Sequence, residues 1–350
     1  MQTFGELFCG AGGMAYGLGK AGFEPKWAVD ADRWACETYR RMIGPHVIEK
    51  RVEDMDFGAL QQVDGLAFGF PCNDFSMVGE RKGTKGYFGG LYKYAKQALD
   101  AVRPDWLIAE NVPGMLASGG HEIMQHFADA GPGYRLAVHL YKFERYGVPQ
   151  KRWRVIGVGI RNDLDKTFLP PAPTHTRPMT AGQALKGVER AEHNNEESRH
   201  SERVKEMLSF IPPGANCWHE DVPERLRLNV PNVRLSLIYR RLKATEPAYT
   251  VVGSGGGGTH MYHHEHLRAL TNRERARLQS FPDDFVFEGP KEAVRKQIGM
   301  AVPPLGAEVI GGALASCLLG ESYESLQPSV GVFEPARKRP YRQAHKAVAV

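Results

Sequence analysis

A cysteine, a carboxylate and two arginines in this 350-residue chain have the types and positions to do chemistry together. Cys72 follows a proline after the apolar residues 63–68, which predict a short buried strand that gives way to a loop. Loops at strand ends carry chemistry more often than strand centres do. A free cysteine also packs readily as a small hydrophobe. A nucleophilic Cys72 therefore needs support from residues elsewhere in the chain.

Glu110 is the candidate acid. The alternative is that Glu110 is a carboxylate of an ordinary surface loop. Against this, Glu110 comes directly after the apolar residues 106–109, which predict a second buried strand. In doubly wound sheets, ligands bind beyond the carboxyl ends of the strands. We therefore expect Glu110 and Cys72 to face the same crevice.

Gln150, Arg152 and Arg154 lead into a third apolar stretch, and at strand spacing they should point to one face. Guanidinium groups bind carboxylates and other anions through paired hydrogen bonds. The two arginines therefore predict an anionic or carboxylate partner on that face.

The N-terminal segment predicts an element that would hold a ligand beside these groups. Residues 3–9 have a strand pattern, a glycine-rich turn follows at 10–13, and residues 14–21 have helical periodicity. Such glycines let the backbone approach a ligand and aim the helix N-terminus at it. Asp30, after a strand pattern at 25–29, lies where an acidic residue would meet ribose hydroxyls. The pattern fits a dinucleotide and S-adenosylmethionine equally.

Helix patterns at residues 33–42 and 92–101 alternate with strand patterns at 65–69, 106–109 and 155–160. Alternation of this kind favours a doubly wound α/β sheet.

The composition changes after residue 162, where prolines gather and periodicity becomes poor until about residue 239. Regular patterns return where Thr271 can cap a helix with Glu274 completing a capping box, and in an apolar helix at 305–319. We therefore predict a catalytic and cofactor-binding domain at 1–162, a smaller irregular domain at 163–285, a segment returning to the first domain at 286–322, and a mobile basic tail at 323–350.

The bulk composition limits the class of protein. With 42% hydrophobic and 24% charged residues, and no apolar run near the roughly 18 residues of a membrane span, we expect a cytoplasmic protein without a membrane partner. Five scattered cysteines without a Cys-x-x-Cys pair favour reduced thiols over disulfides or zinc. Four histidines at 260, 263, 264 and 266 lack acidic or cysteine partners at a defined spacing, so we predict no metal. The net charge of +5, with basic residues in clusters, fits either a polyanionic partner or a solvated charged face.

In this order, the residues resemble those of the DNA cytosine-C5 methyltransferases, from residue 4 to about 319. Six short motifs carry the resemblance: Glu-Leu-Phe-Cys-Gly-Ala-Gly-Gly at 6–13, Gly-Phe-Pro-Cys at 69–72, Glu-Asn-Val at 110–112, Gln-x-Arg-x-Arg at 150–154, residues 268–282, and Gly-Met-Ala-Val-Pro at 299–303. The resemblance implies a Rossmann-like, S-adenosylmethionine-dependent methyltransferase sheet with a smaller, irregular target-recognition domain.

The resemblance also implies roles for Cys72, Glu110 and the two arginines. Cys72 would add as a thiolate to C6 of cytosine, which makes C5 reactive towards a methyl donor. Glu110 would hydrogen-bond N3 and the exocyclic amine, Arg154 would orient the base at O2, and Arg152 would support the loop. Because this chemistry cannot reach a base inside a duplex, the cytosine would be flipped out of double-stranded DNA.

The remaining implied sites concern the cofactor and DNA. S-adenosylmethionine would lie on Phe8, Gly10, Ala11, Gly12, Gly13, Asp30, Ala31, Pro71, Leu91, Ala301 and Val302. DNA would lie on Ser76, Arg81, Lys82 and Lys85 of a loop that closes over the base, on Arg225, Arg227, Arg234, Arg240 and Arg241, and on Thr250 and Val251. Which arginine reads which base, and the target sequence itself, are left open.

Three positions depart from the family pattern. Asn73 stands where the family usually has glutamine, Arg51 where it has an aspartate that contacts adenine, and Met300 where it has asparagine. The Asp-x-Arg-Gly usual in the mobile loop is also absent. Because an arginine cannot accept a hydrogen bond from the adenine amine, we expect an unusual cofactor pocket.

Other functions remain open at this point. A nicotinamide dehydrogenase would share the N-terminal glycine turn but has no use for Cys72, Glu110 and the arginines together. A transfer RNA cytosine-C5 methyltransferase on the same scaffold would characteristically carry a Cys-Phe-Thr tripeptide, which is absent. A catalytically dead, DNA-binding relative would not need Cys72 and Glu110. We expect a monomer, and a cognate restriction endonuclease is an open partner.

Overall fold

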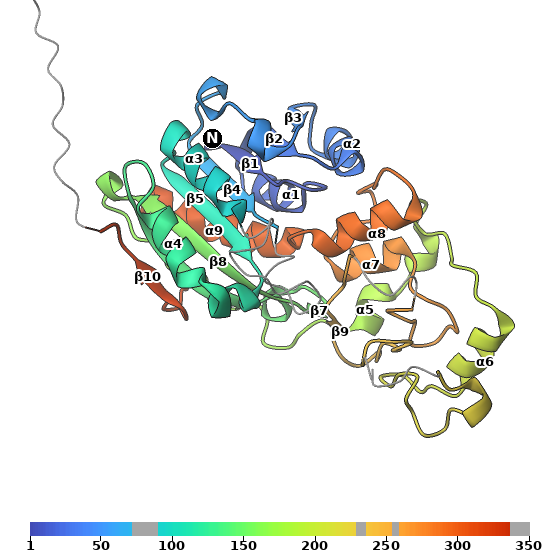
Figure 1. Ribbon diagram of the computed structural model, residues 1–350. Helices are drawn as coiled ribbons and strands as arrows, with labels where there is room; N and C mark the ends of the chain where they lie inside the picture. Colours follow the sequence, from blue (N-terminus) through green and yellow to red (C-terminus); the bar gives the residue numbers. More distant parts are fainter. Residues whose placement is uncertain (72–89, 229–235, 254–258, 337–350) are drawn as a thin grey trace, which may run out of the picture.

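The computed structural model describes residues 1–71, 90–228, 236–253 and 259–336, which form a large α/β unit with a smaller, irregular lobe beside it (Figure 1). The unit is built on a sheet with the order β10-β6-β8-β5-β4-β1-β2-β3. Its strands are β1 Thr3–Leu7, β2 Glu24–Asp30, β3 Val47–Glu49, β4 Gly65–Gly69, β5 Trp106–Asn111, β6 Tyr134–Lys142, β8 Trp153–Arg161 and β10 Gly331–Phe333. Strands β1 to β5 pair in parallel, whereas β8 runs antiparallel to both β5 and β6.

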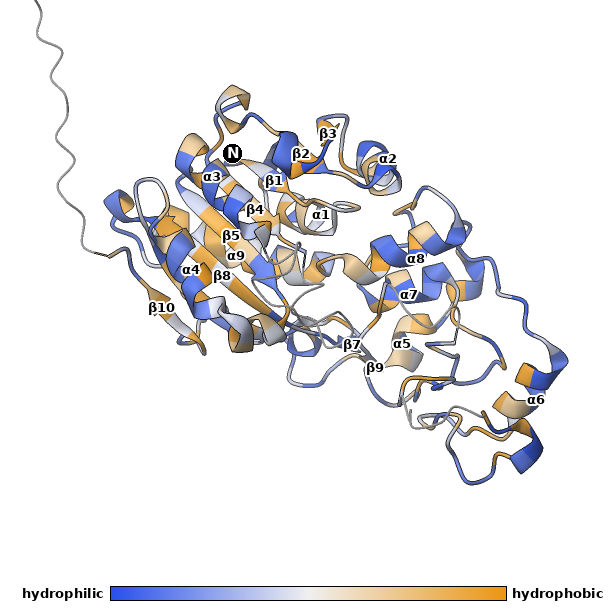
Figure 2. Cartoon of the chain, viewed as in Figure 1, coloured by the Kyte–Doolittle hydropathy of each residue, from blue (hydrophilic) through white to orange (hydrophobic). Residues whose placement is uncertain are grey.

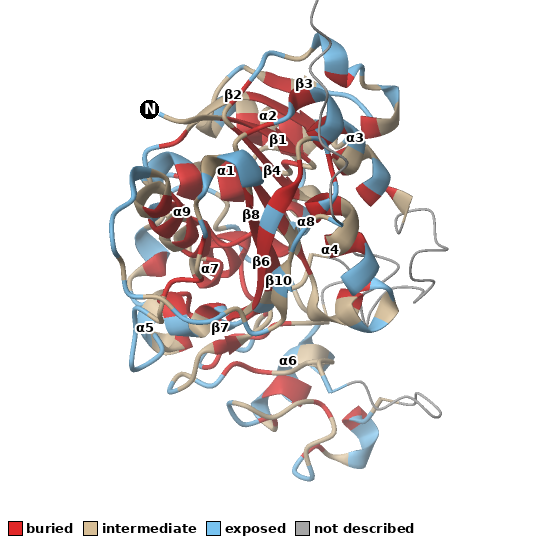
Figure 3. Ribbon diagram, turned by 90° about the vertical axis from the view of Figure 1, so that its left-hand side faces the viewer, coloured by how far each residue is buried: buried red, intermediate tan, exposed pale blue. Residues whose placement is uncertain are grey.

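Helices cover both faces of this sheet. One face packs against α1 Gly13–Lys20, α2 Arg33–Met42 and α9 Pro304–Leu319, and the other against α3 Tyr92–Val102 and α4 Gly120–Ala128. Hydrophobic residues run along the central strands (Figure 2), and the buried residues run along those strands and into α9 (Figure 3). The predicted doubly wound α/β sheet is therefore confirmed, and its helices and strands lie within a few residues of their predicted bounds.

The smaller lobe contains little regular structure. Its helices are α5 Ala181–Leu185, α6 Glu202–Ser209, α7 Asn272–Leu278 and α8 Lys291–Met300, and the short strands β7 Gln150–Lys151 and β9 Ala248–Tyr249 pair in parallel at its base. In the large unit and the lobe together, the described residues form turns of 3-10 helix at η1 Val52–Asp54, η2 Phe57–Ala59, η5 Pro113–Ser118, η6 Phe143–Tyr146, η7 Asn162–Leu164, η8 Val188–Arg190 and η9 Glu224–Leu226. The predicted capping box is confirmed, since Thr271 Oγ1 accepts from Glu274 N at 3.1 Å and Glu274 Oε2 accepts from Thr271 N at 2.7 Å.

Helix α9 returns to the large unit and packs against α1. A Cβ atom at Gly17 would lie 2.2 Å from the carbonyl oxygen of Pro304, so only glycine lets the two helices come this close. By length and composition alone, the helical stretch Lys291–Leu319 could cross a membrane, but 56% of its apolar window is buried inside the protein. The stretch is therefore explained as part of the core.

The prediction of a mobile tail from residue 323 is wrong for the part of it that the structure describes. Strand β10 pairs antiparallel with β6, and just before it Ser329 Oγ accepts from Leu140 N at 2.9 Å while Ser329 N donates to His139 Nδ1 at 3.1 Å. Residues 324–336 therefore form a strap along the edge of the sheet, because β6 would otherwise expose its unpaired backbone groups there.

Candidate active site

The carboxyl ends of β1, β2, β4 and β5 lie side by side, and the order of the sheet reverses between β1 and β4. Open α/β sheets bind their ligands in the crevice at this point. The predicted site residues divide between the two sides of the reversal: the glycine turn and Asp30 lie at the ends of β1 and β2, and Pro71 and Glu110 lie at the ends of β4 and β5.

Glu110 is held by an ion pair at the end of β5. Arg154 Nε lies 2.8 Å from Glu110 Oε1, and both side chains are 13% exposed. Opposite Glu110 on β4 stands Gly69, where a Cβ atom would lie only 3.0 Å from Glu110 Oε2. The absence of a side chain at Gly69 thus leaves room for the carboxylate. Arg154 Nη1 donates to Trp153 O at 2.8 Å, and Nη2 makes no hydrogen bond to the residues that the structure describes.

Asn111 fixes the backbone that leads towards Cys72. Its Nδ2 donates to Phe70 O at 3.1 Å, and its Oδ1 accepts from Val112 N at 2.8 Å. Cys72 and Asn73 themselves lie outside the described residues. The chain therefore passes Glu110 immediately before it reaches residue 72. Sequence reasoning did not single out Asn111 as a site residue, although its place after Glu110 at a strand end was the available signal.

We had predicted that the two arginines of the Gln-x-Arg-x-Arg motif bind one anionic partner together. The contacts among the described residues instead give the two guanidinium groups different partners. Residue 152 falls between β7 and β8, and the Arg152 guanidinium is buried among backbone carbonyls. It donates to Val251 O at 3.1 Å, Gly299 O at 3.0 Å and Ala301 O at 3.0 Å. Arg154, by contrast, meets the Glu110 carboxylate. Arg152 instead joins the lobe to the turn between α8 and α9.

Two buried glutamines extend this connection. Gln150 accepts from Val251 N at 2.9 Å and donates to Leu278 O at 2.8 Å, and it also contacts the side chain of Gln279. Gln279 donates to Ala301 O at 2.8 Å and to Ile298 O at 2.9 Å. Sequence reasoning missed Gln279, because a polar residue after a helix gives no sign of its burial.

The glycine turn and Asp30 form the other half of the crevice. Gly10 N donates to Asp30 Oδ2 at 2.8 Å and Asp32 N donates to Oδ1 at 2.8 Å. Burial raises the pKa of Asp30, and these two backbone donors act in the opposite direction. Gly10 and Gly12 have φ of 54° and 85°, and no atom of the described residues lies within 4 Å of a Cβ built at Gly10. The turn therefore offers an uncovered backbone next to an oriented carboxylate.

The other residues predicted at the cofactor are placed as follows. A Cβ at Gly13 would lie 2.4 Å from Val302 O, so the turn after α8 packs directly on the glycine turn. Phe8 has φ of 56° and is partly buried, Ala31 is exposed after Asp30, and Leu91 is buried at the start of α3. Ala11 faces the core of the lobe instead of the crevice.

Comparison with known proteins identifies the family. The sequence profile of the family described as C-5 cytosine-specific DNA methylase matches residues 2–316. The chain belongs to this family. It is 50% identical over 347 residues to the Type II methyltransferase M.BbvI of Brevibacillus brevis, covering 92% of this chain and 93% of the relative. It is 39% identical to the Type II methyltransferase M.NgoFVII of Neisseria gonorrhoeae, covering 92% and 88%.

A solved structure supports the fold. The crystal structure of a DNA modification methyltransferase encoded within an E. coli prophage superposes with a TM-score of 0.71 at 22% identity, covering 91% of this chain and all of that one. The protein is therefore a DNA cytosine-C5 methyltransferase with a Rossmann-like fold, its methyl donor is S-adenosylmethionine, and its substrate is DNA rather than transfer RNA.

The methyltransferase presents its predicted DNA-binding arginines in different ways. Arg241 is buried, and its guanidinium donates to His263 O at 3.1 Å, Ile211 O at 2.8 Å and His264 O at 2.6 Å, among others. This arrangement corrects the expectation that Arg241 binds DNA, because its donors are already used inside the lobe. Arg225 pairs with Glu206 at 3.0 Å, and Arg227 donates to Val222 O at 3.0 Å.

The other predicted DNA contacts are near the crevice or outside the described residues. Thr250 donates to Lys151 O at 2.7 Å, whereas Val251 is buried against Gln150 and Arg152. Ser76, Arg81, Lys82, Lys85 and Arg234 lie outside the described residues.

Two departures from the family pattern can be located in the methyltransferase. Arg51 is exposed and its Nη2 lies 2.9 Å from Glu53 Oε1. Met300 is exposed at the end of α8, close to Gly253. The unusual cofactor pocket expected from these residues stays a prediction.

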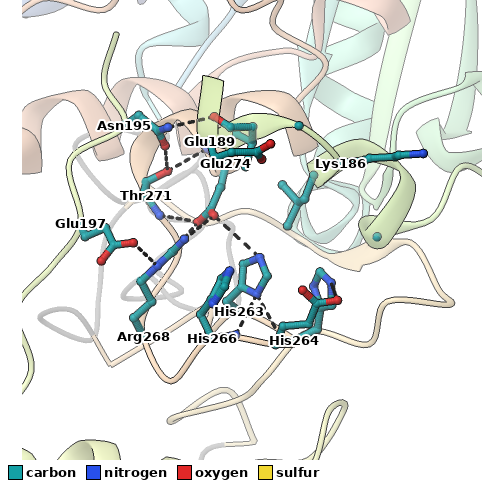
Figure 4. Close-up of a pocket in the computed structure, with 15 residues that line it drawn as sticks. Lys186, Glu189, Asn195, Glu197, His263, His264, His266, Arg268, Thr271 and Glu274 are labelled. Atoms are coloured by element: carbon teal, nitrogen blue, oxygen red, sulfur yellow. Dashed lines mark hydrogen bonds and ion pairs between the residues drawn. The ribbon is translucent and has the colours of Figure 1, made fainter. Parts of the chain in front are cut away.

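A cavity of about 500 Å³ lies in the lobe of the methyltransferase, and Glu110 is not among the residues that line it (Figure 4). Its floor is a closed network in which Arg268 forms two 2.8 Å hydrogen bonds with Glu274, and His263 Nδ1 accepts from Glu265 N at 2.9 Å. Desolvation lowers the pKa of His263 to about 4. Within the described part of the chain, no group of three histidine, cysteine or acidic side chains is placed to hold a metal ion.

Proposed function

We propose that this methyltransferase acts through Cys72 as nucleophile on a cytosine flipped out of duplex DNA, with Glu110 and Arg154 holding the base. The observation that carries the proposal is the Glu110–Arg154 pair beside the chain that leads into residue 72. A carboxyl group that carries a proton can donate to N3 of cytosine while its other oxygen accepts from the exocyclic amine, and a guanidinium can donate to O2. The pair is rigid, and rigid placement of reacting groups can contribute roughly 7 to 11 kcal/mol to catalysis.

The Cys72 thiolate bonds to C6, and the electrons of the C5–C6 double bond pass to C5 and the ring while a protonated Glu110 donates a hydrogen bond to N3. C5 would then take the methyl group from the sulfonium sulfur of the donor, whose bond to that carbon breaks and whose positive charge is thereby neutralised. The C5 proton leaves to a water molecule, the double bond re-forms and Cys72 departs as thiolate. Arg154 has a role throughout, because Nη2, which bonds to none of the described residues, can hold O2 while Nε keeps Glu110 in position.

The glycine turn, Asp30 and the turn at Ala301 and Val302 fit the cofactor. S-adenosylmethionine supplies an electrophilic methyl group when it is bound. The uncovered backbone at Gly10 can approach it, and the Asp30 carboxylate, oriented by two backbone donors, suits its ribose hydroxyls. Phe8, Ala31, Pro71 and Leu91 would complete the pocket.

DNA would lie across the lobe and the crevice, with Thr250 near the flipped base. Flipping costs on the order of a few kcal/mol, which contacts to the extruded base and to phosphates would offset. We assign Ser76, Arg81, Lys82 and Lys85 to the DNA side on the resemblance alone. A specific short target, a cytoplasmic location, a monomeric state and a cognate restriction endonuclease complete the proposal; the Type II relatives favour the last of these.

The nucleophile is tested with Cys72→Ser, and Cys317→Ser serves as a matched control because Cys317 is buried in α9 away from the crevice. Purified protein is mixed with methyl-labelled S-adenosylmethionine and either genomic DNA or transfer RNA. We expect label in DNA with wild type and Cys317→Ser, none with Cys72→Ser, and a gel shift with all three. Turnover near wild type in Cys72→Ser would remove Cys72 from the mechanism, and label in transfer RNA alone would remove DNA as the substrate.

A further inference from the structure

We propose that Arg240 is the residue that reads a guanine in the target sequence. This inference rests on the proposed function and adds the identity of a specificity-determining side chain. Arginine recognises guanine by donating two hydrogen bonds to O6 and N7 in the major groove. A reader must therefore present free guanidinium donors in a fixed orientation.

Arg225, Arg227 and Arg241 already donate to partners within the protein. Of the predicted DNA-binding arginines that the structure describes, Arg240 is therefore the candidate. Arg241 spends its donors on backbone carbonyls inside the lobe. Arg225 faces Glu206 with both terminal nitrogens, and Arg227 closes a turn on Val222 O. No carboxylate of the described residues pairs with Arg240, and its side chain donates to none of their hydrogen-bond acceptors.

Arg240 is also held in place before DNA arrives. Its guanidinium carbon lies over the Tyr249 ring, 5.0 Å from the centroid. Its carbonyl accepts from Tyr249 Oη at 3.0 Å and from Tyr262 N at 2.9 Å. Stacking on an aromatic face leaves the N–H edge of a guanidinium free. A side chain that is already ordered loses less entropy on binding.

The surroundings of Arg240 suit a DNA strand. It lines a groove of about 470 Å³ together with Lys151, Lys243 and Tyr249. Glu246 bonds both lysines, at 2.7 Å from Lys243 Nζ and 3.2 Å from Lys151 Nζ. Because the two lysines share one exposed carboxylate, their positive charge is only partly balanced. They can therefore release Glu246 and bind DNA phosphates instead. The lysines would therefore bind the backbone while Arg240 meets the base edge.

The groove also lies next to residues that the proposed function places at the flipped base. Tyr249 precedes Thr250, whose hydroxyl donates to Lys151 O, and strand β9 pairs with β7 just ahead of Arg152 and Arg154. A base read by Arg240 should therefore be close to the flipped cytosine in the target sequence.

The test begins with plasmid methylated by wild type, in which bisulfite sequencing defines the target. Each guanine of a synthetic target is then replaced in turn by 7-deazaguanine, which lacks the N7 acceptor. We expect one position at which wild type loses roughly 5- to 150-fold in kcat/KM. Arg240→Ala should be indifferent to the replacement at that position and should accept other bases there. Tyr249→Leu should relax the same position by a smaller factor.

Arg190→Ala is the control, because Arg190 is 88% exposed elsewhere in the lobe. It should keep the wild-type pattern, and thermal melting should show that each variant is folded. An equal loss by Arg240→Ala on all sequences, with a weaker salt dependence, would mean a phosphate contact and would overturn the proposal. Unchanged specificity would overturn it as well. A wild type that methylates no DNA would instead refute the proposed function.

Discussion

At the scale of single residues, the partners of each charged side chain decide what it can do. Arg154 meets a carboxylate at the crevice, Arg152 and Arg241 donate to backbone carbonyls, and Arg240 lies above an aromatic ring and donates to no acceptor of the described residues. All four carry the same charge, so charge alone does not separate them. The availability of donors does, because a guanidinium has five N–H groups in a fixed fork and no acceptor.

The protonation state of His263 decides whether its ring can hold the loop that contains it. The neutral ring accepts from Glu265 N and His266 N through Nδ1, which is possible only while Nδ1 carries no proton. Its Nε2 lies 3.8 Å from Glu274, the rings of His264 and His266 flank it, and Arg268 is nearby. The same loop supplies carbonyls to Arg241. Protonation of His263 should therefore loosen the lobe.

We predict that the stability of the protein falls as the pH drops from about 6.5 to about 4. The pKa of His263 is lower in the folded state than in the unfolded state, so the unfolded chain binds the proton first and stability rises with pH across this range. Thermal melting at several pH values measures the effect, and His263→Gln should flatten the curve. His175→Gln, at an exposed histidine, should leave it unchanged. Identical pH profiles for wild type and His263→Gln would refute the assignment.

At the scale of elements, the C-terminal strap completes the sheet. Beyond the β10–β6 pairing, Glu334 binds Arg135 at 3.0 Å, and Ala336 N donates to Asp129 at 2.8 Å. The strap thereby ties the edge of the sheet to the end of α4.

Removal of residues 324–350 should lower the free energy of unfolding by on the order of 2 to 3 kcal/mol, because several backbone and side-chain hydrogen bonds and the packing of Phe333 are lost. Removal of residues 337–350 alone is the control and should change it little. Urea unfolding followed by circular dichroism compares the two. Equal stabilities of the two truncated chains would show that the strap contributes nothing.

Local patterns in the sequence predicted the elements whose signals are local. The capping box at Thr271 and Glu274 needs only its own four residues, and Glu110 after four apolar residues marks the end of β5. Strand β10 could not be predicted in this way, since it depends on an edge strand, β6, far away in the chain. The partners of Arg152 are equally remote: Val251 and Gly299 follow it by 99 and 147 positions. Spacing within the motif therefore suggested one shared face, and long-range packing decided otherwise.

At the scale of the whole molecule, two buried arginines differ in the parts of the protein that they hold together. Arg152 joins Val251 of the lobe to Gly299 and Ala301, and Ala301 precedes the Val302 carbonyl that packs on Gly13. Arg241 bonds carbonyls that all belong to the lobe. The first arginine therefore links the DNA side to the cofactor side, and the second supports the DNA side alone.

Replacing each arginine by methionine should separate these two roles. Either change leaves buried carbonyls without donors, so we expect each to lower the free energy of unfolding by roughly 3 kcal/mol. Arg152→Met should also weaken both S-adenosylmethionine binding, measured by calorimetry, and DNA binding, measured by gel shift. Arg241→Met should weaken DNA binding and leave S-adenosylmethionine binding at the wild-type level. If both variants bind S-adenosylmethionine as wild type does, Arg152 does not couple the two sites, because a residue that positions the turn at Ala301 cannot be lost without a change on the cofactor side.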